Sequence, residues 1–273
     1  QVTITEAHNV IRPDQAEEEI RSCLHLTLHI LRTLGLQDDV TFRLSKWDPN
    51  NKAKYLGDEE YWEKTQDALR QVLIEENLPF TEAEGEAAFY GPKIDTQAKN
   101  VYGKEDTMCT VQLDCAIAEN FDMYYIDQNG EKIRPYIIHR TSLGCYERTL
   151  AWLIEHYAGK FPTWMCPEQV RVLPISDKYL DYAETVRKAL AAEGVDVTVD
   201  TRSEKIGFKI REARMAKLPY MLIVGQNEEE AGLVSVRSRF AGDEGQKPLA
   251  EFVAQIVEEI KNKTIREEEQ QEQ

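Results

Sequence analysis

The sequence predicts two domains of different classes, an α+β domain built on an antiparallel sheet and a compact α/β domain that follows it. Helical patterns over residues 13–36 and 58–76 precede short alternating segments between residues 80 and 122. This succession is typical of helices that pack on an antiparallel sheet. From residue 170 onward, single strands alternate with single helices, which is typical of an α/β domain.

The first domain is expected to contain three helices. Residues 13–36 place Ile20, Leu24 and Leu31 on one helical face, and Gly35 is a stop signal. The turn signal at residues 127–130 (DQNG) predicts a hairpin formed by the segments on either side of it. The expected helices cover residues 13–36, 58–76 and 144–158, and the expected strands lie within 3–8, 40–44, 89–95, 109–114, 123–126 and 134–139.

Gly159, Pro162 and Pro167 interrupt the pattern and mark a domain boundary. We place the first domain at residues 1–163, the second at 164–265 and a polar tail at 266–273. The second domain is expected to have strands at residues 170–175, 195–199, 219–224 and 234–237, and helices at 178–193, 206–216 and 249–261.

Composition excludes several classes of protein. With 33 Lys and Arg against 49 Asp and Glu among 273 residues, the net charge is −16, which argues against a broadly basic nucleic-acid coat protein. Hydrophobic residues make up 42% of the chain in periodic runs, which argues against disorder throughout. No apolar run is long enough to span a membrane. The five cysteines show no CxxC spacing, which favours reduced thiols in a cytoplasmic protein.

The histidines offer candidate metal ligands. His25 and His29 lie four residues apart on the first predicted helix, but no acidic or cysteine partner completes a ligand pattern there, so we interpret them as structural, like His156. His8 and His139 each close a strand-like segment, from which an imidazole can reach a central cleft. Spacing alone leaves both a shared metal site and two ordinary core histidines open.

Arg148 lies near the start of a mostly apolar predicted helix. A guanidinium in such a place is costly unless it meets an anion or a carboxylate. A salt bridge, for example with Glu147, would satisfy it. A triphosphate would satisfy it too, because the planar fork of arginine matches phosphate oxygens.

Nine motifs in the order of one family make the sequence resemble the threonyl-tRNA synthetases, which are class II aminoacyl-tRNA synthetases. The similarity spans nearly the whole chain. It implies the C-terminal part of a class II catalytic domain, followed by an α/β anticodon-binding domain with a mixed sheet. The motifs occupy residues 90–95 (YGPKID), 110–114 (TVQLD), 134–140 (RPYIIHR), 143–148 (LGCYER), 161–164 (FPTW), 172–175 (VLPI), 202–212 (RSEKIGFKIRE), 219–222 (PYML) and 234–239 (VSVRSR).

The resemblance implies a zinc ion held by one Cys and two His. His8 and His139 match the two histidines, whereas the matching Cys lies outside this chain. Zinc in this family contacts the amino group and the hydroxyl of threonine. An isosteric valine would leave the metal unsatisfied, which explains the selectivity. The chain begins at Gln1 without a Met, so we expect an N-terminal portion upstream.

The resemblance also implies a substrate pocket. Arg148 matches the arginine of the third class II motif, which grips the phosphates of ATP, with Mg²⁺ as the companion ion. Gln112 and Lys93 complete the expected catalytic set. The expected substrate-binding residues are Glu6, Tyr90, Gln112 and Thr141.

The sequence departs from the family pattern at several pocket positions. Glu6 stands where Asp is usual, and a longer carboxylate either keeps the contact with threonine or crowds the zinc. Ile4 replaces a common Gln, Thr107 replaces a pocket Gln, and Cys145 replaces a Ser. The change at Thr107 bears most directly on threonine recognition.

In the second domain a basic helix lies inside an acidic chain. Its cations either form an ordinary solvated face paired with Glu204 and Glu212 or contact phosphates of RNA. The resemblance favours RNA and implies that Glu228 and Arg237 meet anticodon bases. The expected tRNA-binding residues are Lys205, Lys209, Arg211, Glu228 and Arg237.

The resemblance thus implies the C-terminal part of a threonine–tRNA ligase that uses threonine, ATP and tRNA(Thr), forms a homodimer at full length and has no membrane partner. We expect this chain alone to be inactive, because a motif-two arginine and the zinc Cys lie outside it. Two alternatives remain, a prolyl or histidyl synthetase of the same subclass and a non-catalytic tRNA-binding or regulatory paralogue.

Overall fold

A computed structural model describes residues 1–266, and these divide into two compact units. The first runs from Gln1 to Glu155 and the second begins at His156. Of the polar tail predicted at residues 266–273, all but Arg266 lies outside the described residues.

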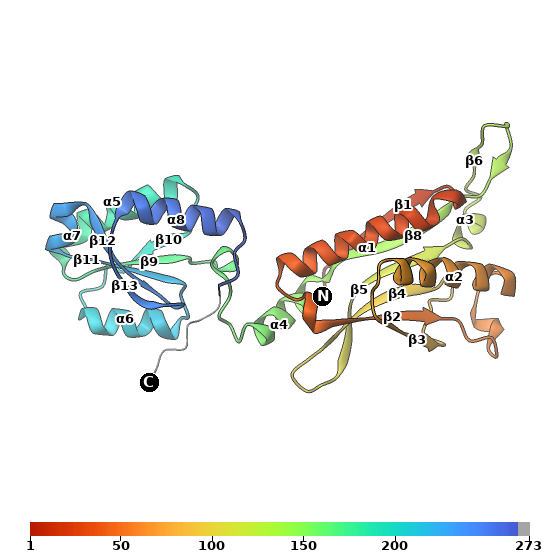
Figure 1. Ribbon diagram of the computed structural model, residues 1–273, viewed down its shortest axis with the longest axis horizontal. Helices are drawn as coiled ribbons and strands as arrows, with labels where there is room; N and C mark the ends of the chain where they lie inside the picture. The colour runs from red at the N-terminus through yellow and green to blue at the C-terminus, as the bar shows by residue number, and fades with distance from the viewer. Residues whose placement is uncertain (267–273) are drawn as a thin grey trace. The chain divides into compact units, whose positions relative to one another are not determined.

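The first unit is built on a six-stranded sheet in the order β1-β8-β5-β4-β2-β3 (Figure 1). Neighbouring strands are antiparallel except for the parallel pair β2–β3. The predicted α+β class is therefore confirmed. The strands are β1 (Ile4–Ile11), β2 (Val40–Lys46), β3 (Phe80–Glu84), β4 (Lys93–Lys99), β5 (Glu105–Asp114) and β8 (Tyr136–Cys145).

Two long helices, α1 (Ala16–Thr33) and α2 (Glu59–Glu75), cover one face of this sheet. The stripe predicted on the first helix is buried: Ile20 and Leu24 pack against apolar strand residues such as Val111 and Ile138. Gly35 follows the helix with a φ of +72°, the left-handed conformation that glycine adopts without strain. Because strand side chains alternate, the opposite face of the sheet is left for polar residues.

The hairpin was predicted with the wrong partner for its first strand. Residues 123–126 were expected to pair with 134–139, but the hairpin consists of β6 (Tyr125–Ile126) and β7 (Lys132–Ile133). The second predicted segment instead belongs to β8, which lies between β1 and β5 in the large sheet. Its residues Ile137 and Ile138 are buried there, and a two-stranded ribbon could not provide that burial. A short helix, α3 (Ile117–Asn120), precedes the hairpin.

The second unit is an α/β domain with a five-stranded mixed sheet in the order β10-β9-β11-β12-β13. Strands β10, β9 and β11 are parallel to one another, whereas β12 pairs antiparallel with both β11 and β13. Helices α5 and α8 cover one face of the sheet and α6 the other (Figure 1). The first unit ends within α4 (Tyr146–His156), whose Trp152 packs against residues of that unit. The helices and strands of the second unit are β9 (Val170–Pro174), α5 (Leu180–Ala192), β10 (Val197–Val199), α6 (Ile206–Met215), β11 (Tyr220–Val224), α7 (Gln226–Ala231), β12 (Leu233–Ser238), β13 (Gly242–Pro248) and α8 (Leu249–Lys261).

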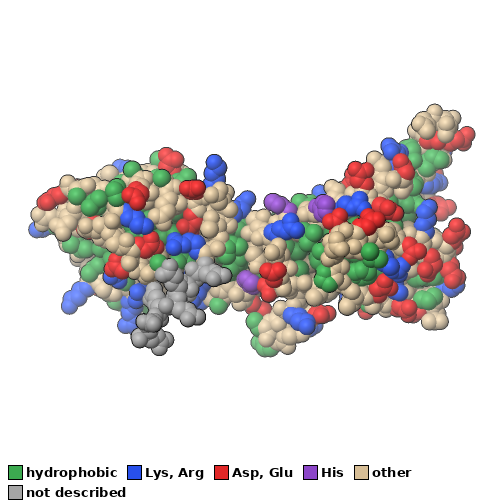
Figure 2. Space-filling model, viewed as in Figure 1, with side chains coloured by type: hydrophobic (Ala, Val, Ile, Leu, Met, Phe, Trp, Pro, Cys, Tyr) green, Lys and Arg blue, Asp and Glu red, His purple; other side chains and the backbone are tan. Residues whose placement is uncertain are grey.

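Acidic and basic side chains are interspersed over the face of the molecule seen in Figure 2. A continuous basic surface is not visible on that face, in keeping with the net charge of −16. Within residues 1–266, no helix combines the length and the apolar character needed to cross a bilayer.

Candidate active site and metal centre

Four predicted site residues form a row across the open face of the large sheet. His8 on β1 pairs directly with His139 on β8, and His139 pairs in turn with Gln112 on β5. Gln112 is opposite Lys93 on β4. Because directly opposed residues share a face of the sheet, β-pairing brings these four side chains together from segments up to 131 positions apart.

A second row lies two residues further along the same strands. Glu6 pairs with Thr141, whose hydroxyl accepts a hydrogen bond of 2.7 Å from the backbone N–H of Thr110. Thr110 pairs with Asp95 on β4, and its hydroxyl donates to that carboxylate at 3.2 Å. Glu6 therefore lies next to the histidines, and Thr141 borders the same surface.

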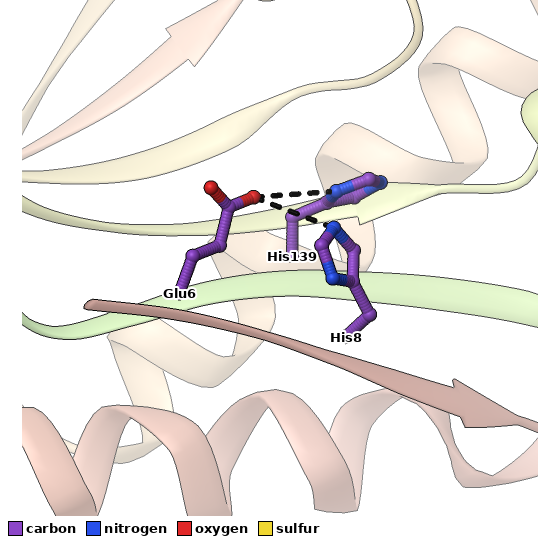
Figure 3. A group of neighbouring side chains, drawn as sticks. All are labelled: Glu6, His8 and His139. Atoms are coloured by element: carbon purple, nitrogen blue, oxygen red, sulfur yellow. Dashed lines mark ion pairs between the residues drawn. The ribbon is translucent and has the colours of Figure 1, made fainter. Parts of the chain in front are cut away.

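Glu6, His8 and His139 form a possible metal-binding cluster (Figure 3). The Glu6 carboxylate lies between the two rings, 3.4 Å from His8 Nε2 and 3.8 Å from His139 Nδ1. Ligand atoms about 2.0–2.1 Å from a tetrahedral zinc ion lie about 3.3 Å from one another. These three donors, of chemical types that zinc accepts, thus fit one small cation.

Tyr90 and Gln112 close one side of the cluster. The Tyr90 hydroxyl donates a hydrogen bond of 2.6 Å to Gln112 Oε1, and its ring lies 5.0 Å from the ring of His139. Burial raises the pKa of Tyr90, and the nearby carboxylates of Glu6 and Asp114 raise it further. The hydroxyl is therefore a neutral donor at physiological pH.

The cations beside this surface are held by a buried carboxylate that sequence reasoning missed. Asp95 is fully buried and lies 3.1 Å from Lys93 Nζ and 3.0 Å from Arg43 Nη2. Ser45 and Thr110 donate hydrogen bonds to it as well. Arg43 Nη2 also lies 3.9 Å from the carboxylate of Glu86, so two carboxylates match the two cations. Lys93 is the cation of this group that stands in the row with Gln112. The signal in the sequence was an acidic residue two positions after Lys93 in an alternating strand.

Arg148 lies at the start of α4, directly after β8. It is exposed, and its Nη1 donates a hydrogen bond of 2.8 Å to the carbonyl oxygen of Thr107. It does not pair with Glu147, whose carboxylate instead accepts from the backbone N–H of Thr3. The side chains of Asp106 and Glu155 line a small cavity beside it. The Arg148 guanidinium can thus bind an anion, which would have to displace its hydrogen bond to the Thr107 carbonyl.

The turn that places Arg148 requires a glycine. Gly144 has a φ of +71°, and a methyl group there would lie 1.9 Å from the carbonyl oxygen of Met108. We predict that Gly144→Ala lowers the free energy of unfolding by about 2–5 kcal/mol, the sum of left-handed strain and overpacking. Urea unfolding followed by circular dichroism measures this loss. Gly130→Ala is the matched control, since Gly130 also has a positive φ but nothing lies within 4 Å of the added methyl. Equal losses in the two variants would contradict the close contact.

In the second unit the predicted RNA residues separate into two groups. Lys205, directly before α6, and Arg211, within α6, are both exposed. Lys209 is only 2% exposed, and its ammonium donates to the backbone carbonyls of Pro174 and Asp200 at 3.2 and 3.0 Å. Contrary to the prediction, Lys209 does not lie on a basic surface, because its side chain connects the ends of β9 and β10 inside the fold.

Glu228 and Arg237 are both partly buried and already paired. The Glu228 carboxylate accepts hydrogen bonds from Gly225 N–H, the Ser235 hydroxyl and the Gln246 amide. Burial opposes ionisation of Glu228, but these bonds outweigh it and lower its pKa. Arg237 lies 2.7 Å from Asp243. An anticodon base would have to exchange with these partners.

Comparison with protein families assigns both units. A family model described as "tRNA synthetase class II core domain (G, H, P, S and T)" matches residues 1–157, more than half of the chain. The chain belongs to the class II tRNA synthetases. A second model, described as "Anticodon binding domain", matches residues 169–259 of this synthetase.

Curated relatives of this class II synthetase are threonine–tRNA ligases. The ligase of Clostridium perfringens is 57% identical over 263 residues, which cover 96% of this chain and 41% of that protein. The ligase of Geobacillus kaustophilus is 45% identical over 97% of this chain and 41% of its own length. The chain therefore spans about two fifths of the length of these relatives.

A solved structure has the same fold. The RNA-binding domain of threonyl-tRNA synthetase from Cryptosporidium parvum superposes with a TM-score of 0.82 at 34% identity. The superposition covers 93% of this chain and 62% of the other. The predicted order of a class II core followed by an anticodon-binding domain is confirmed.

Proposed function

We propose that this chain carries part of the active site and the anticodon-binding domain of a threonine–tRNA ligase. The activity would be ATP-dependent activation of threonine and its transfer to tRNA(Thr). The observation that carries the proposal is the pairing of His8 with His139 next to Glu6, in one row with Gln112 and Lys93. The names of the curated relatives support the choice of threonine over proline or histidine.

Glu6, His8 and His139 would hold a zinc ion, with a Cys outside this chain as a further ligand. When bound, zinc would supply a Lewis-acidic contact for the amino group and hydroxyl of threonine. Glu6 is long enough to reach both histidines, so it is either a ligand itself or a partner of the threonine hydroxyl. Valine lacks the hydroxyl and would leave this polar site unsatisfied.

The chain's other residues would orient the reactants. Tyr90 and Gln112 are joined by a hydrogen bond beside the cluster and would border the threonine pocket together with Thr141. Lys93 and Arg148 would neutralise the phosphates of ATP, which binds with Mg²⁺. Attack of the threonine carboxylate on the α-phosphate then needs alignment and charge neutralisation more than proton transfer.

Threonine-dependent ATP–pyrophosphate exchange tests the proposal. The assay uses the full-length protein, because this chain covers only 41% of the length of its curated relatives. We expect exchange with threonine and little with valine, proline or histidine. If exchange depended on proline or histidine instead, that amino acid and not threonine would be the substrate. Tight tRNA binding without exchange for any amino acid would instead favour a non-catalytic paralogue. The departures from the family pattern at Ile4 and Thr107 would then be the first candidates for the cause of the lost activity.

For the complete protein we also propose homodimerisation and a cytoplasmic location. Within the present chain we propose residues 164–265 as the tRNA-binding domain, with Lys205, Arg211, Glu228 and Arg237 on its RNA-facing surface.

The exposed cations of α6 should set the salt dependence of tRNA binding. We predict that replacing both Lys205 and Arg211 by alanine weakens binding of tRNA to the 273-residue chain. The slope of log K against log salt should become shallower by about one unit per residue removed, because each phosphate contact releases counterions. Filter binding across a salt series measures the slope. Lys209→Met is the control: it should reduce stability but leave the slope unchanged, since Lys209 is buried.

A further inference from the structure

Asp114, which the sequence did not single out, lies directly behind the metal cluster. It is the last residue of β5 and is fully buried. One carboxylate oxygen, Oδ1, accepts hydrogen bonds of 2.9 Å from the backbone N–H groups of Ala116 and Ile117. The other, Oδ2, lies 3.0 Å from His139 Nε2. The carboxylate is therefore fixed in orientation, with one oxygen for the backbone and one for the histidine.

The two ring nitrogens of His139 face different groups. Nε2 meets Asp114, whereas Nδ1 points to the cluster, 3.8 Å from Glu6 Oε1. The side chain is 13% exposed, and its ring centroid lies 5.0 Å from that of Tyr90 and 4.6 Å from that of His8. These contacts leave the ring little freedom to turn over.

We propose that Asp114 is a positioning residue that holds His139 in the tautomer with the proton on Nε2, so that Nδ1 is the metal-binding atom. An ionised carboxylate can only accept a hydrogen bond, so it selects the N–H form of the nitrogen it meets. His8 would bind through Nε2, the nitrogen that faces Glu6. This inference rests on the proposed metal site and adds to it the ligating atoms and the residue that fixes them.

Asp114→Asn should reverse the tautomer without removing the local fold. The asparagine oxygen would keep the hydrogen bonds from Ala116 and Ile117, since only an acceptor fits there. Its NH₂ group would then face His139 Nε2 as a donor. The histidine must respond by accepting at Nε2 and carrying its proton on Nδ1, where it cannot bind a metal.

Asp127→Asn is a matched control in the β6–β7 hairpin. The Asp127 Oδ1 also accepts two backbone hydrogen bonds, from Asn129 and Glu131, at 2.9 and 2.8 Å. The variant removes the same charge from the same kind of turn, but within residues 1–266 no histidine is among the hydrogen-bond partners of Asp127. Asp127→Asn should therefore leave the tautomer of His139 unchanged.

Long-range ¹H–¹⁵N correlation spectra of the metal-free 273-residue chain report the tautomer of His139 directly. We expect Nε2–H in the wild type and in Asp127→Asn, and Nδ1–H in Asp114→Asn. A wild-type ring with its proton on Nδ1 would overturn the inference. So would an Asp114→Asn variant with the wild-type tautomer. The wild-type spectrum decides the matter even if the variant does not fold.

Zinc titration against a chromophoric chelator gives the second measurement on the same chain. Asp114→Asn should weaken zinc binding by about 10–100-fold, as is typical when an outer partner of a ligand is lost, and Asp127→Asn should not. Tight zinc binding that Asp114→Asn leaves unchanged would overturn this inference while the proposed metal site stands. A wild-type chain with the expected tautomer and no affinity for zinc would overturn the metal site itself.

Discussion

Replacing Arg148 by alanine in the complete protein is expected to slow threonine-dependent ATP–pyrophosphate exchange by about 10²–10³-fold, the usual cost of removing one donor to transition-state charge. The guanidinium is exposed at the start of α4 and uses one of its five N–H groups on the carbonyl of Thr107. The rest of the fork can therefore meet phosphate oxygens. Rapid-quench measurement of exchange at saturating threonine would give the loss.

Comparing two replacements of Arg148 separates the contribution of its charge from that of its planar geometry. Arg148→Lys keeps the charge but loses the planar fork, so its rate should fall between those of the wild type and the alanine variant. Threonine binding and zinc content should stay the same in both variants, because Arg148 does not contact the cluster. Arg70→Ala is the control. It removes an arginine that pairs with Glu82, and α2 lies on the face of the sheet opposite the site. A rate for Arg148→Ala equal to that of Arg70→Ala would contradict the assignment.

The site residues were identified from the family's motifs, whereas strand spacing alone left His8 and His139 open as either metal ligands or core histidines. The segment around Gln112 alternates clearly, with Val111 and Leu113 facing the helices, whereas His139 follows two buried residues, Ile137 and Ile138. Which strands lie side by side is not local. β8 contacts β1 and β5 across more than 20 intervening residues, and this register alone brings Asp114 to His139. The role of Asp114 was therefore out of reach of periodicity.

At Lys209, helical spacing and residue type give opposite predictions. Ile206, Ile210 and Ala213 line the inner face of α6, and Lys209 is three residues after the first and four before the last. Helical spacing therefore places Lys209 on the inner side, whereas residue type suggested an exposed cation. The strand β13 was missed for a different reason. Gly242–Pro248 is polar and rich in glycine, and its only strand signal is the pairing with β12.

Removing one histidine of the cluster should abolish specific metal binding. We predict that His8→Ala and His139→Ala each weaken zinc binding to the 273-residue chain by more than 100-fold, beyond the 10–100-fold typical of losing an outer partner. Each histidine supplies one of three donors whose ligand atoms lie within 4.8 Å of one another, and the remaining two cannot complete a tetrahedral site. In the complete protein the same variants should lose threonine activation, and added chelator should reproduce that loss in the wild type.

His25→Ala and His29→Ala are the controls for this prediction. They stand four residues apart on α1, a spacing that can bind a metal, but His25 Nε2 is 2.7 Å from Glu76 and no third donor completes a cluster there among the described residues. Zinc affinity should not change in either variant. If the α1 variants lost zinc and the strand variants kept it, the metal centre would belong on the helix. If the strand variants lost zinc but still activated threonine selectively over valine, the metal would not be the source of selectivity, and the Tyr90–Gln112 side of the pocket would have to supply it.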